Sequence, residues 1–366
     1  MTTPASKSNV PPSWKPQLSE AAQGEASPDQ KANAAAANAG IKAPGLAPVP
    51  TPASVPPVLI EALDKDTQGM VWSFFSFEEL NTFVESFEKA GKPVDPAIWQ
   101  RMKTMVLGEY PELQQAVKTW DQQSVPLAEQ GYRLREIRQS MQQCAFGTGK
   151  WLKHFGKVGD VPPLPADIHQ ILNGPDHLNP ASKIKDTHVL VLVPKVVDVT
   201  DADGKVKNRV EISLASLGEL VKTPKEGPRT QYRYFQAHNK ANTLVEESHW
   251  VLMKKEILPG SRGKTFAEQQ RIVQTHSKTT GIPYEMPHAI DAAACCLLNF
   301  VSTNTRLFDV DGPEGNTYTR CQEHVEIEGV EGKWPLIVGG FASGGLDVGD
   351  SDYDSHYDGV GAARKF

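Results

Sequence analysis

One cysteine and several histidines are the side chains of this chain that could do nucleophilic chemistry. Cysteine catalysis needs a thiolate, a histidine within hydrogen-bond reach and a group that orients the histidine. Cys321 falls in an expected strand, and the histidines that could act as its base are His249, His276, His288 and His324. No motif selects one pair among them. Cys321 is therefore a candidate nucleophile, but the sequence predicts no complete catalytic constellation.

A second candidate site is the loop at the start of "PGSRGKTFAEQQ", Pro259–Gln270. An expected strand leads into this loop, which carries Ser261, Arg262 and Lys264. The next helix is expected to begin at Thr265, so its free N–H groups would point back toward these side chains and favour an anion. The alternative is an ordinary solvated loop, because cations and glycines are common between a strand and a helix.

Phosphate-loop and metal motifs are incomplete in this chain. "GTGK" at 147–150 lacks the earlier glycine and the following Ser or Thr of a phosphate loop, and a helix is expected before it. No histidine spacing matches a zinc motif. The acidic tail does not follow the EF-hand pattern, since Ser355 and Gly361 replace the required glycine and glutamate. We predict no metal and no cofactor, and an exposed loop between two strands for the tail aspartates Asp347, Asp350, Asp352, Asp354 and Asp358.

The composition limits the classes of partner. The net charge of −6 over 366 residues gives no basic footprint for nucleic acid. The four cysteines are too few and too irregularly spaced for a disulfide framework, which favours a reducing compartment. No apolar stretch approaches the roughly 20 residues of a membrane span, and the N-terminus lacks the order of a secretory signal. We therefore expect a soluble protein.

The elements that must position these residues divide into three regions. Residues 1–57 are rich in Ala and Pro and nearly lack large apolar side chains, which predicts a disordered linker. Residues 58–148 predict a small helical domain, because apolar residues recur at helical spacing between capping signals. Its expected helices run from Ser76 to Gly91, Asp95 to Gly108, Pro111 to Gln122 and Leu127 to Cys144.

Residues 149–366 predict an α+β domain in which a mixed, mostly antiparallel sheet packs with two or three helices. One helix should begin at Thr265 with Glu268 in capping-box position, and a second, apolar on nearly every face, should follow Pro287. A hairpin is expected from His188–Val199 and Lys205–Leu214. Further strands are expected at Gln231–Gln236, Ser248–Leu258, Thr317–Ile327, Trp334–Phe341 and Val360–Phe366.

Two family resemblances accompany these patterns. "VLIEAL", "VWSFFSFEEL", "NTFVESFEKA" and "IWQRM", followed by "GEYPEL", resemble a degenerate F-box between about residues 58 and 113. The usual opening Leu-Pro and the Val-Cys-Lys-x-Trp segment are absent. "WLKHFGKVGDVPPLPADIHQIL", "HWVLMKKEILPGSRGKTFAEQQ", "GIPYEMP" and "YTRCQE" resemble an uncharacterised C-terminal domain of chlamydia-like intracellular bacteria. That second resemblance implies no activity. Together they imply a cytoplasmic location, in the bacterium or, after secretion, in the host cytosol.

These observations leave three hypotheses for function. In the first, the chain is an adaptor or effector whose F-box-like helices dock a Skp-type ubiquitin-ligase subunit. Its anchors would be Trp72, Phe74, Phe75, Phe77, Leu80 and Trp99, unless the same rings are simply the core of a helical bundle. In the second, the C-terminal domain is an enzyme that uses Cys321 or the Ser261, Arg262 and Lys264 loop. In the third, the chain is a non-catalytic module that self-associates. The oligomeric state is left open.

Overall fold

The computed structural model describes residues 96–201, 203–310, 315–327, 332–351 and 354–366. Every structural statement below concerns these residues, which all belong to one compact unit of the chain. The predicted linker at 1–57, the helix predicted from Ser76 and the anchors between Trp72 and Leu80 lie outside them.

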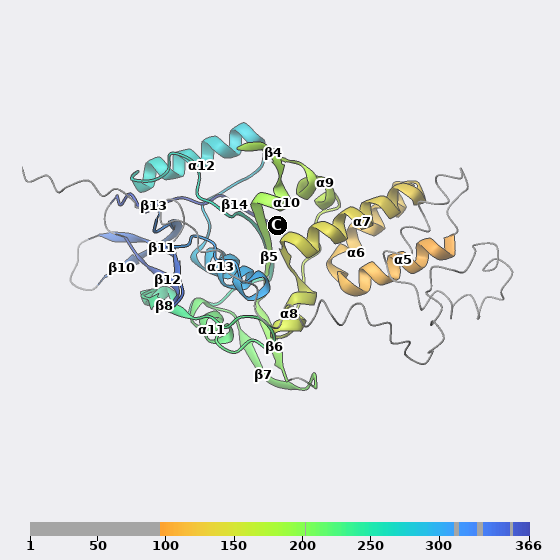
Figure 1. Cartoon of the computed structure of the whole chain (residues 1–366), viewed down its shortest axis with the longest axis horizontal. Helices are drawn as coiled ribbons and strands as arrows, with labels where there is room; N and C mark the ends of the chain where they lie inside the picture. Colours follow the sequence, from red (N-terminus) through yellow and green to blue (C-terminus); the bar gives the residue numbers. More distant parts are fainter. Residues whose placement is uncertain (1–95, 202, 311–314, 328–331, 352–353) are drawn as a thin grey trace, which may run out of the picture. The chain divides into compact units, whose positions relative to one another are not determined.

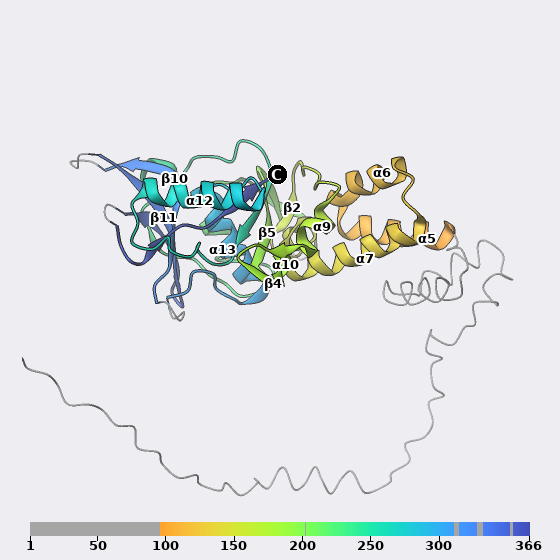
Figure 2. The same ribbon diagram turned by 90° about the horizontal axis from the view of Figure 1, so that it is seen from above.

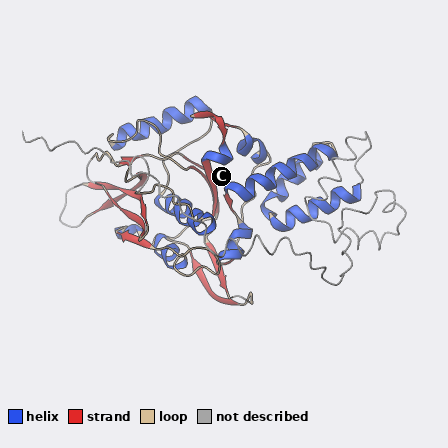
Figure 3. Cartoon of the chain, viewed as in Figure 1, coloured by secondary structure: helices blue, strands red, loops and turns tan. Residues whose placement is uncertain are grey.

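The described chain begins with helices, as the sequence predicts (Figures 1 and 3). Pro96 occupies the first helical position, where its missing N–H costs nothing. Leu134, Ile137 and Met141 are buried along one face, which confirms the expected inward face. The elements are α5 (Pro96–Glu109), the 3₁₀ turn η2 (Pro111–Leu113), α6 (Gln114–Gln122) and α7 (Leu127–Cys144).

Helix α7 runs directly into a first sheet. Its strand order is β1-β5-β9-β14, with β1 parallel to β5 and the other pairs antiparallel. All residues of β5 and β9 are buried, which explains why both sequences are almost continuously apolar. The strands are β1 (Ala145–Phe146), β5 (His188–Val193), β9 (His249–Lys254) and β14 (Ala363–Lys365).

A second sheet has the order β13-β10-β11-β12-β8. Helix α13 (Ala289–Thr303) contacts β5 and β9 of the first sheet and β10, β11 and β12 of the second, and it lies between the two sheets in Figures 1 and 2. Burial on both sides explains its apolar residues on every face. The strands are β8 (Tyr232–Phe235), β10 (Tyr318–Glu326), β11 (Lys333–Ala342), β12 (Gly345–Asp350) and β13 (Asp358–Gly359).

Smaller elements complete the described fold. One three-stranded sheet has the order β2-β6-β7, and β3 pairs with β4. The short helices and the second 3₁₀ turn were not predicted, because three to seven residues carry too little periodicity. The elements are β2 (Gly156–Val158), β3 (Pro175–Asp176), β4 (Asn179–Lys183), β6 (Val196–Thr200), β7 (Val206–Glu211), α8 (Thr148–His154), α9 (Ile168–Asn173), α10 (Ile184–Thr187), α11 (Leu214–Leu220), η3 (His238–Lys240) and α12 (Phe266–Thr280).

The structure confirms the α+β class with mixed, mostly antiparallel sheets, but it alters two details. The strand predicted at His188–Val199 is two strands, because the chain leaves the first sheet at Pro194 and enters the three-stranded sheet at Val196. The boundary predicted after residue 148 falls inside one continuous hydrophobic core, which includes residues from α5 to β14. Helix α7 therefore packs against β1 and β5, and α5 packs on α7.

Candidate functional site

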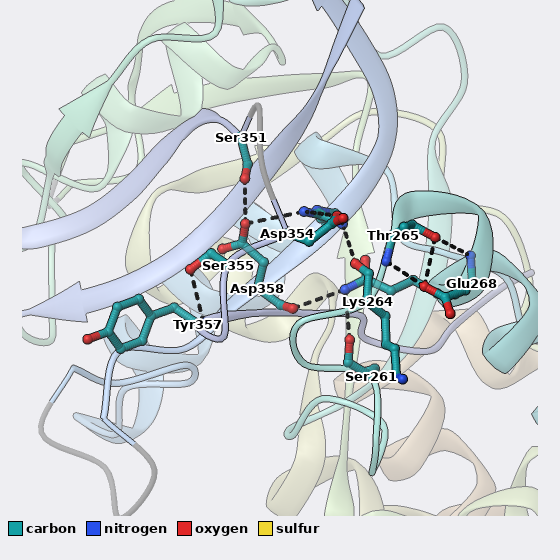
Figure 4. Close-up of polar contacts among 11 residues, drawn as sticks. Ser261, Lys264, Thr265, Glu268, Ser351, Asp354, Ser355, Tyr357 and Asp358 are labelled. Atoms are coloured by element: carbon teal, nitrogen blue, oxygen red, sulfur yellow. Dashed lines mark hydrogen bonds and ion pairs between the residues drawn. The ribbon is translucent and has the colours of Figure 1, made fainter.

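The predicted anion loop contacts the acidic tail (Figure 4). Ser261 is completely buried, and its hydroxyl donates to the carbonyl of Leu258 at 2.7 Å and accepts the N–H of Val360 at 3.1 Å. Figure 4 shows Ser261 and Lys264 beside Asp354 and Asp358 of the tail. The hydroxyl that was expected to bind an anion therefore closes the loop onto the last strands.

Arg262 and the start of α12 are also engaged within the protein. The Arg262 guanidinium donates to the carbonyls of Asn316, His356 and Tyr357 at 3.2–3.3 Å. At the helix start, the N–H and hydroxyl of Thr265 each donate to a Glu268 carboxylate oxygen at 2.9 Å, which confirms the capping box. These hydrogen bonds also hold the pKa of Glu268 below its ordinary value. Three donors of the predicted anion site, the Ser261 hydroxyl, the Arg262 guanidinium and the Thr265 N–H, therefore already have acceptors within the protein.

The acidic tail faces a buried arginine. Arg320 is 2% exposed, and its guanidinium lies 3.3 Å from Asp354 Oδ1 and 3.6 Å from Asp358 Oδ2. Burial raises the pKa of Asp358, although the hydroxyl of Ser351 and the charge of Arg320 oppose that rise. Asp347 and Asp350 lie on β12 and not in an exposed loop. Among the described residues, no group of His, Cys, Asp and Glu is arranged to hold a metal ion.

Cys321 lacks the environment of a nucleophile. Its side chain is completely buried, its Sγ lies 3.7 Å from the carbonyl oxygen of Thr319, and burial raises its pKa well above the ordinary value. The four candidate bases are engaged elsewhere. His249 lies against Asp291 at 2.8 Å, His276 stacks on Tyr284, His288 lies 3.0 Å from Glu323, and His324 packs edge-on against Phe266. Among the described residues, each of the four candidate histidines thus has a partner other than the Cys321 thiol.

Trp99 is part of the core. It is 5% exposed and belongs to the hydrophobic cluster that α5 shares with the sheets. Trp99 is the one predicted anchor among the described residues, and its burial agrees with the alternative interpretation that the aromatic residues form a core. Trp99 is therefore not available as a docking anchor.

The "GTGK" segment, which begins α8, lies against an internal carboxylate. The helix predicted to end at Cys144 does end there, and a two-residue strand, β1, lies between it and this segment. The hydroxyl of Thr148 donates to Glu112 Oε2 at 2.8 Å, and a Cβ on Gly147 would lie only 2.5 Å from Glu112 Oε1. Burial raises the pKa of Glu112, although the bonds from Thr148 oppose that rise. The glycine thus makes room for a carboxylate of the helical layer.

An open groove of about 410 Å³ lies between α12 and β10. Its apolar lining comes from Phe266, Val273, Tyr284 and Met286, of which the last three are buried. Its polar lining comes from Gln270, Gln274, Glu285, Gln322 and His324. We call this the α12–β10 groove. Its volume lies within the range of small-molecule pockets, and both apolar and polar side chains line it.

Local sequence explains how α12 forms one wall of the groove. Phe266, Gln270, Val273 and Gln274 fall at i, i+4, i+7 and i+8, so they share one face of the helix. The capping box fixes where the helix begins. Gly281 ends it in the left-handed region with φ of 68°, a conformation that glycine adopts without strain.

A β-bulge forms the other wall. Arg320 pairs with Ile337 and His324 pairs with Pro335, so residues 321–323 oppose a single residue of β11. The bulge directs the Gln322 amide to the carbonyl of Met286 at 2.6 Å and the Glu323 carboxylate to the N–H of Ala289 at 2.9 Å. It therefore links β10 to the start of α13 and leaves Gln322 and His324 along the groove.

A buried polar cluster fixes the floor at Tyr284. The Tyr284 hydroxyl lies 3.2 Å from His188 Nε2, and burial raises the pKa of Tyr284 to about 12. Burial and the charge of Lys254 lower the pKa of His188 to about 4, so this imidazole is neutral at pH 7. Lys254 in turn forms a buried ion pair with Asp176. The cluster holds Tyr284 in place and is itself closed to solvent.

No family model, curated protein or solved structure matches this chain.

Sequence reasoning missed the groove because its residues come from three separate segments without a common motif. Of its walls, the sequence predicted the helix that begins at Thr265 and the strand at Thr317–Ile327, but not the bulge in that strand. No helix of the described chain has both the length and the apolar character that crossing a membrane requires.

Proposed function

We propose that this protein is an interaction adaptor. Its α+β part would hold a polypeptide segment of a target protein in the α12–β10 groove, and its F-box-like segment would dock a Skp-type subunit of a ubiquitin ligase. The observation that carries the proposal is the groove, where apolar side chains, free amides and a carboxylate face one open volume.

Binding suits this groove better than catalysis. A catalytic site needs a nucleophile or a positioned acid and base within reach of one reacting atom. The groove lining holds no Ser, Cys or Lys. The ring of its histidine, His324, lies with Nδ1 3.1 Å from the carbonyl oxygen of Gln322 and packs against Phe266. These side chains can recognise a ligand but cannot readily transform it.

The ligase half of the proposal is supported by the F-box-like order of apolar segments between residues 58 and 113. Because Trp99 is core, the anchors would be Trp72, Phe74, Phe75, Phe77 and Leu80. Such a partner would be met in a host cytosol after secretion. Aromatic anchors of this kind commonly dominate protein interfaces.

The groove half is tested by panning the full chain against phage that display random peptides. The wild-type chain should enrich related sequences, and Gln274→Trp, which fills the groove from an exposed position, should abolish that enrichment. Gln142→Trp is the matched control, because Gln142 is exposed on α7, away from the groove. A wild-type chain that enriches no peptide would rule out peptide binding in the groove.

The ligase half needs a separate measurement. A purified Skp-type subunit is titrated against the full chain by biolayer interferometry. Replacement of Trp72 and Phe75 by alanine should weaken binding at least tenfold, since interface anchors typically contribute 2 kcal/mol or more each. Tyr234→Ala with Phe235→Ala is the control for loss of exposed aromatic surface. Absence of binding to the wild-type chain would remove the ligase from the proposal and leave the groove untouched.

A further inference from the structure

We infer that the α12–β10 groove takes an extended peptide of a partner protein that carries an apolar residue close to a lysine or arginine. This inference rests on the proposed adaptor function and names the class of segment that the groove recognises. Three features of the groove carry it, namely the spacing of its amides, its apolar floor and its charge.

The amide spacing matches an extended backbone. Gln270 and Gln274 are exposed on α12, and neither side chain bonds to another described residue. Four residues of α-helix rise about 6 Å, and two residues of an extended chain span about 6.6 Å. Each amide has both a donor and an acceptor. The two glutamines can therefore hydrogen-bond alternate peptide units of a strand that lies along α12.

The apolar floor accepts side chains from one face of such a strand. Successive side chains of an extended peptide point to opposite sides, so every second one would point toward the floor. Val273, Tyr284 and Met286 form this floor and are each less than a tenth exposed. The ordered Tyr284 and the thioether of Met286 favour an aliphatic or aromatic side chain there. The floor thus selects a peptide with an apolar residue at one position.

The charge of the groove selects the peptide residue that lies close to this apolar position. Glu285 is exposed, and its carboxylate forms no ion pair with a described residue. The nearby Glu323 is already engaged with His288 at 3.0 Å and with the N–H of Ala289. The groove lining contains no lysine or arginine. The Glu285 carboxylate therefore favours a basic side chain of the peptide and disfavours an acidic one.

The test uses the full chain, random phage-displayed peptides and then the most enriched peptide in synthetic, fluorescent form. Sequences enriched by the wild-type chain should share an apolar residue near Lys or Arg. Peptides enriched on the Glu285→Lys variant should carry Asp or Glu where the wild-type chain selects Lys or Arg. Glu256→Lys reverses an exposed charge elsewhere and should leave the selected peptides unchanged. In fluorescence polarisation, Gln270→Ala with Gln274→Ala should raise Kd about tenfold or more. Gln142→Ala is the matched control.

The outcomes separate the two proposals. If peptides bind in the groove but share no basic position, or if Glu285→Lys leaves their charge preference unchanged, this inference fails and the adaptor proposal stands. If no peptide is enriched, both fail. A dimer in light scattering that Gln274→Trp converts to a monomer would assign the groove to a second copy of the chain and overturn the inference.

Discussion

Replacing Asp176 by asparagine should lower the unfolding free energy by about 3–5 kcal/mol, which is typical when one partner of a buried ion pair is removed. Asp176 and Lys254 are both almost completely buried. Without the carboxylate, the Lys254 ammonium would remain beside His188 and His276. Burial lowers the pKa values of both histidines, and the charge of Lys254 lowers them further. The variant therefore keeps a buried charge without a counter-ion.

The reverse change should cost less. In Lys254→Met the Asp176 carboxyl still accepts the N–H of Leu178 at 3.1 Å, and it can take up a proton. We expect a loss of about 1–3 kcal/mol, close to that of one charged hydrogen bond. The double variant should be less destabilised than the sum of the two single variants, because it contains no unpaired charge.

Urea unfolding followed by tryptophan fluorescence measures these changes. With an m-value of about 3 kcal/mol/M, the Asp176→Asn midpoint should fall by roughly 1–1.7 M. Glu326→Gln is the control, because Glu326 pairs with Lys333 on the surface and should leave the midpoint unchanged. A midpoint within 0.3 M of the wild type for Asp176→Asn, or additive effects in the double variant, would refute the reasoning.

The same pair should contribute to acid sensitivity. Burial would raise the pKa of Asp176, but the bonds from Lys254 and Leu178 outweigh it and lower that pKa. A depressed carboxyl pKa stabilises the fold above the unfolded-state pKa, and this contribution is lost as pH falls through the folded-state pKa. The difference between wild type and Asp176→Asn should therefore shrink on acidification below about pH 4.

Three further outcomes are expected. Burial raises the pKa of Glu112, so its ionised form destabilises the fold as pH rises above the unfolded-state pKa. Glu112→Gln should therefore raise the urea midpoint more at pH 8 than at pH 4. Equal shifts at the two pH values would contradict this. Thr265→Ala should cost about 1 kcal/mol in the same assay through loss of the capping box, whereas the exposed Thr275→Ala should not. Maleimide labelling of Cys321, read by mass spectrometry, should be more than about a thousandfold slower in the folded chain than in urea; rapid labelling of the native chain would restore the enzyme hypothesis.

The parts of the fold that the sequence predicts are those with a local cause. The helix after Thr265 has its cap, its apolar face and its terminal glycine within about 17 residues, and the structure has it at Phe266–Thr280. The buried helix after Pro287 is equally local, because burial on every side leaves apolar residues at every position. Strong local patterns of this kind need no knowledge of the rest of the chain.

The parts that sequence reasoning missed depend on distant partners. Strand β12 looked like an acidic, glycine-rich loop because Asp347 bonds to Arg233, more than a hundred residues away in sequence. The loop at Ser261 looked like an anion site because its partners come from the tail, where the carbonyls of His356 and Tyr357 accept from Arg262 and the N–H of Val360 donates to Ser261. The groove combines α12, the segment at Glu285 and a bulge that no residue pattern announces.

The junction between α7 and β1 has a consequence for any adaptor role. Cys144 ends the helix and Ala145 begins the strand, with no residue between them to serve as a hinge. Because these helices and the sheets share one hydrophobic core, a cargo seated in the α12–β10 groove would keep a fixed orientation toward the helices of 96–144.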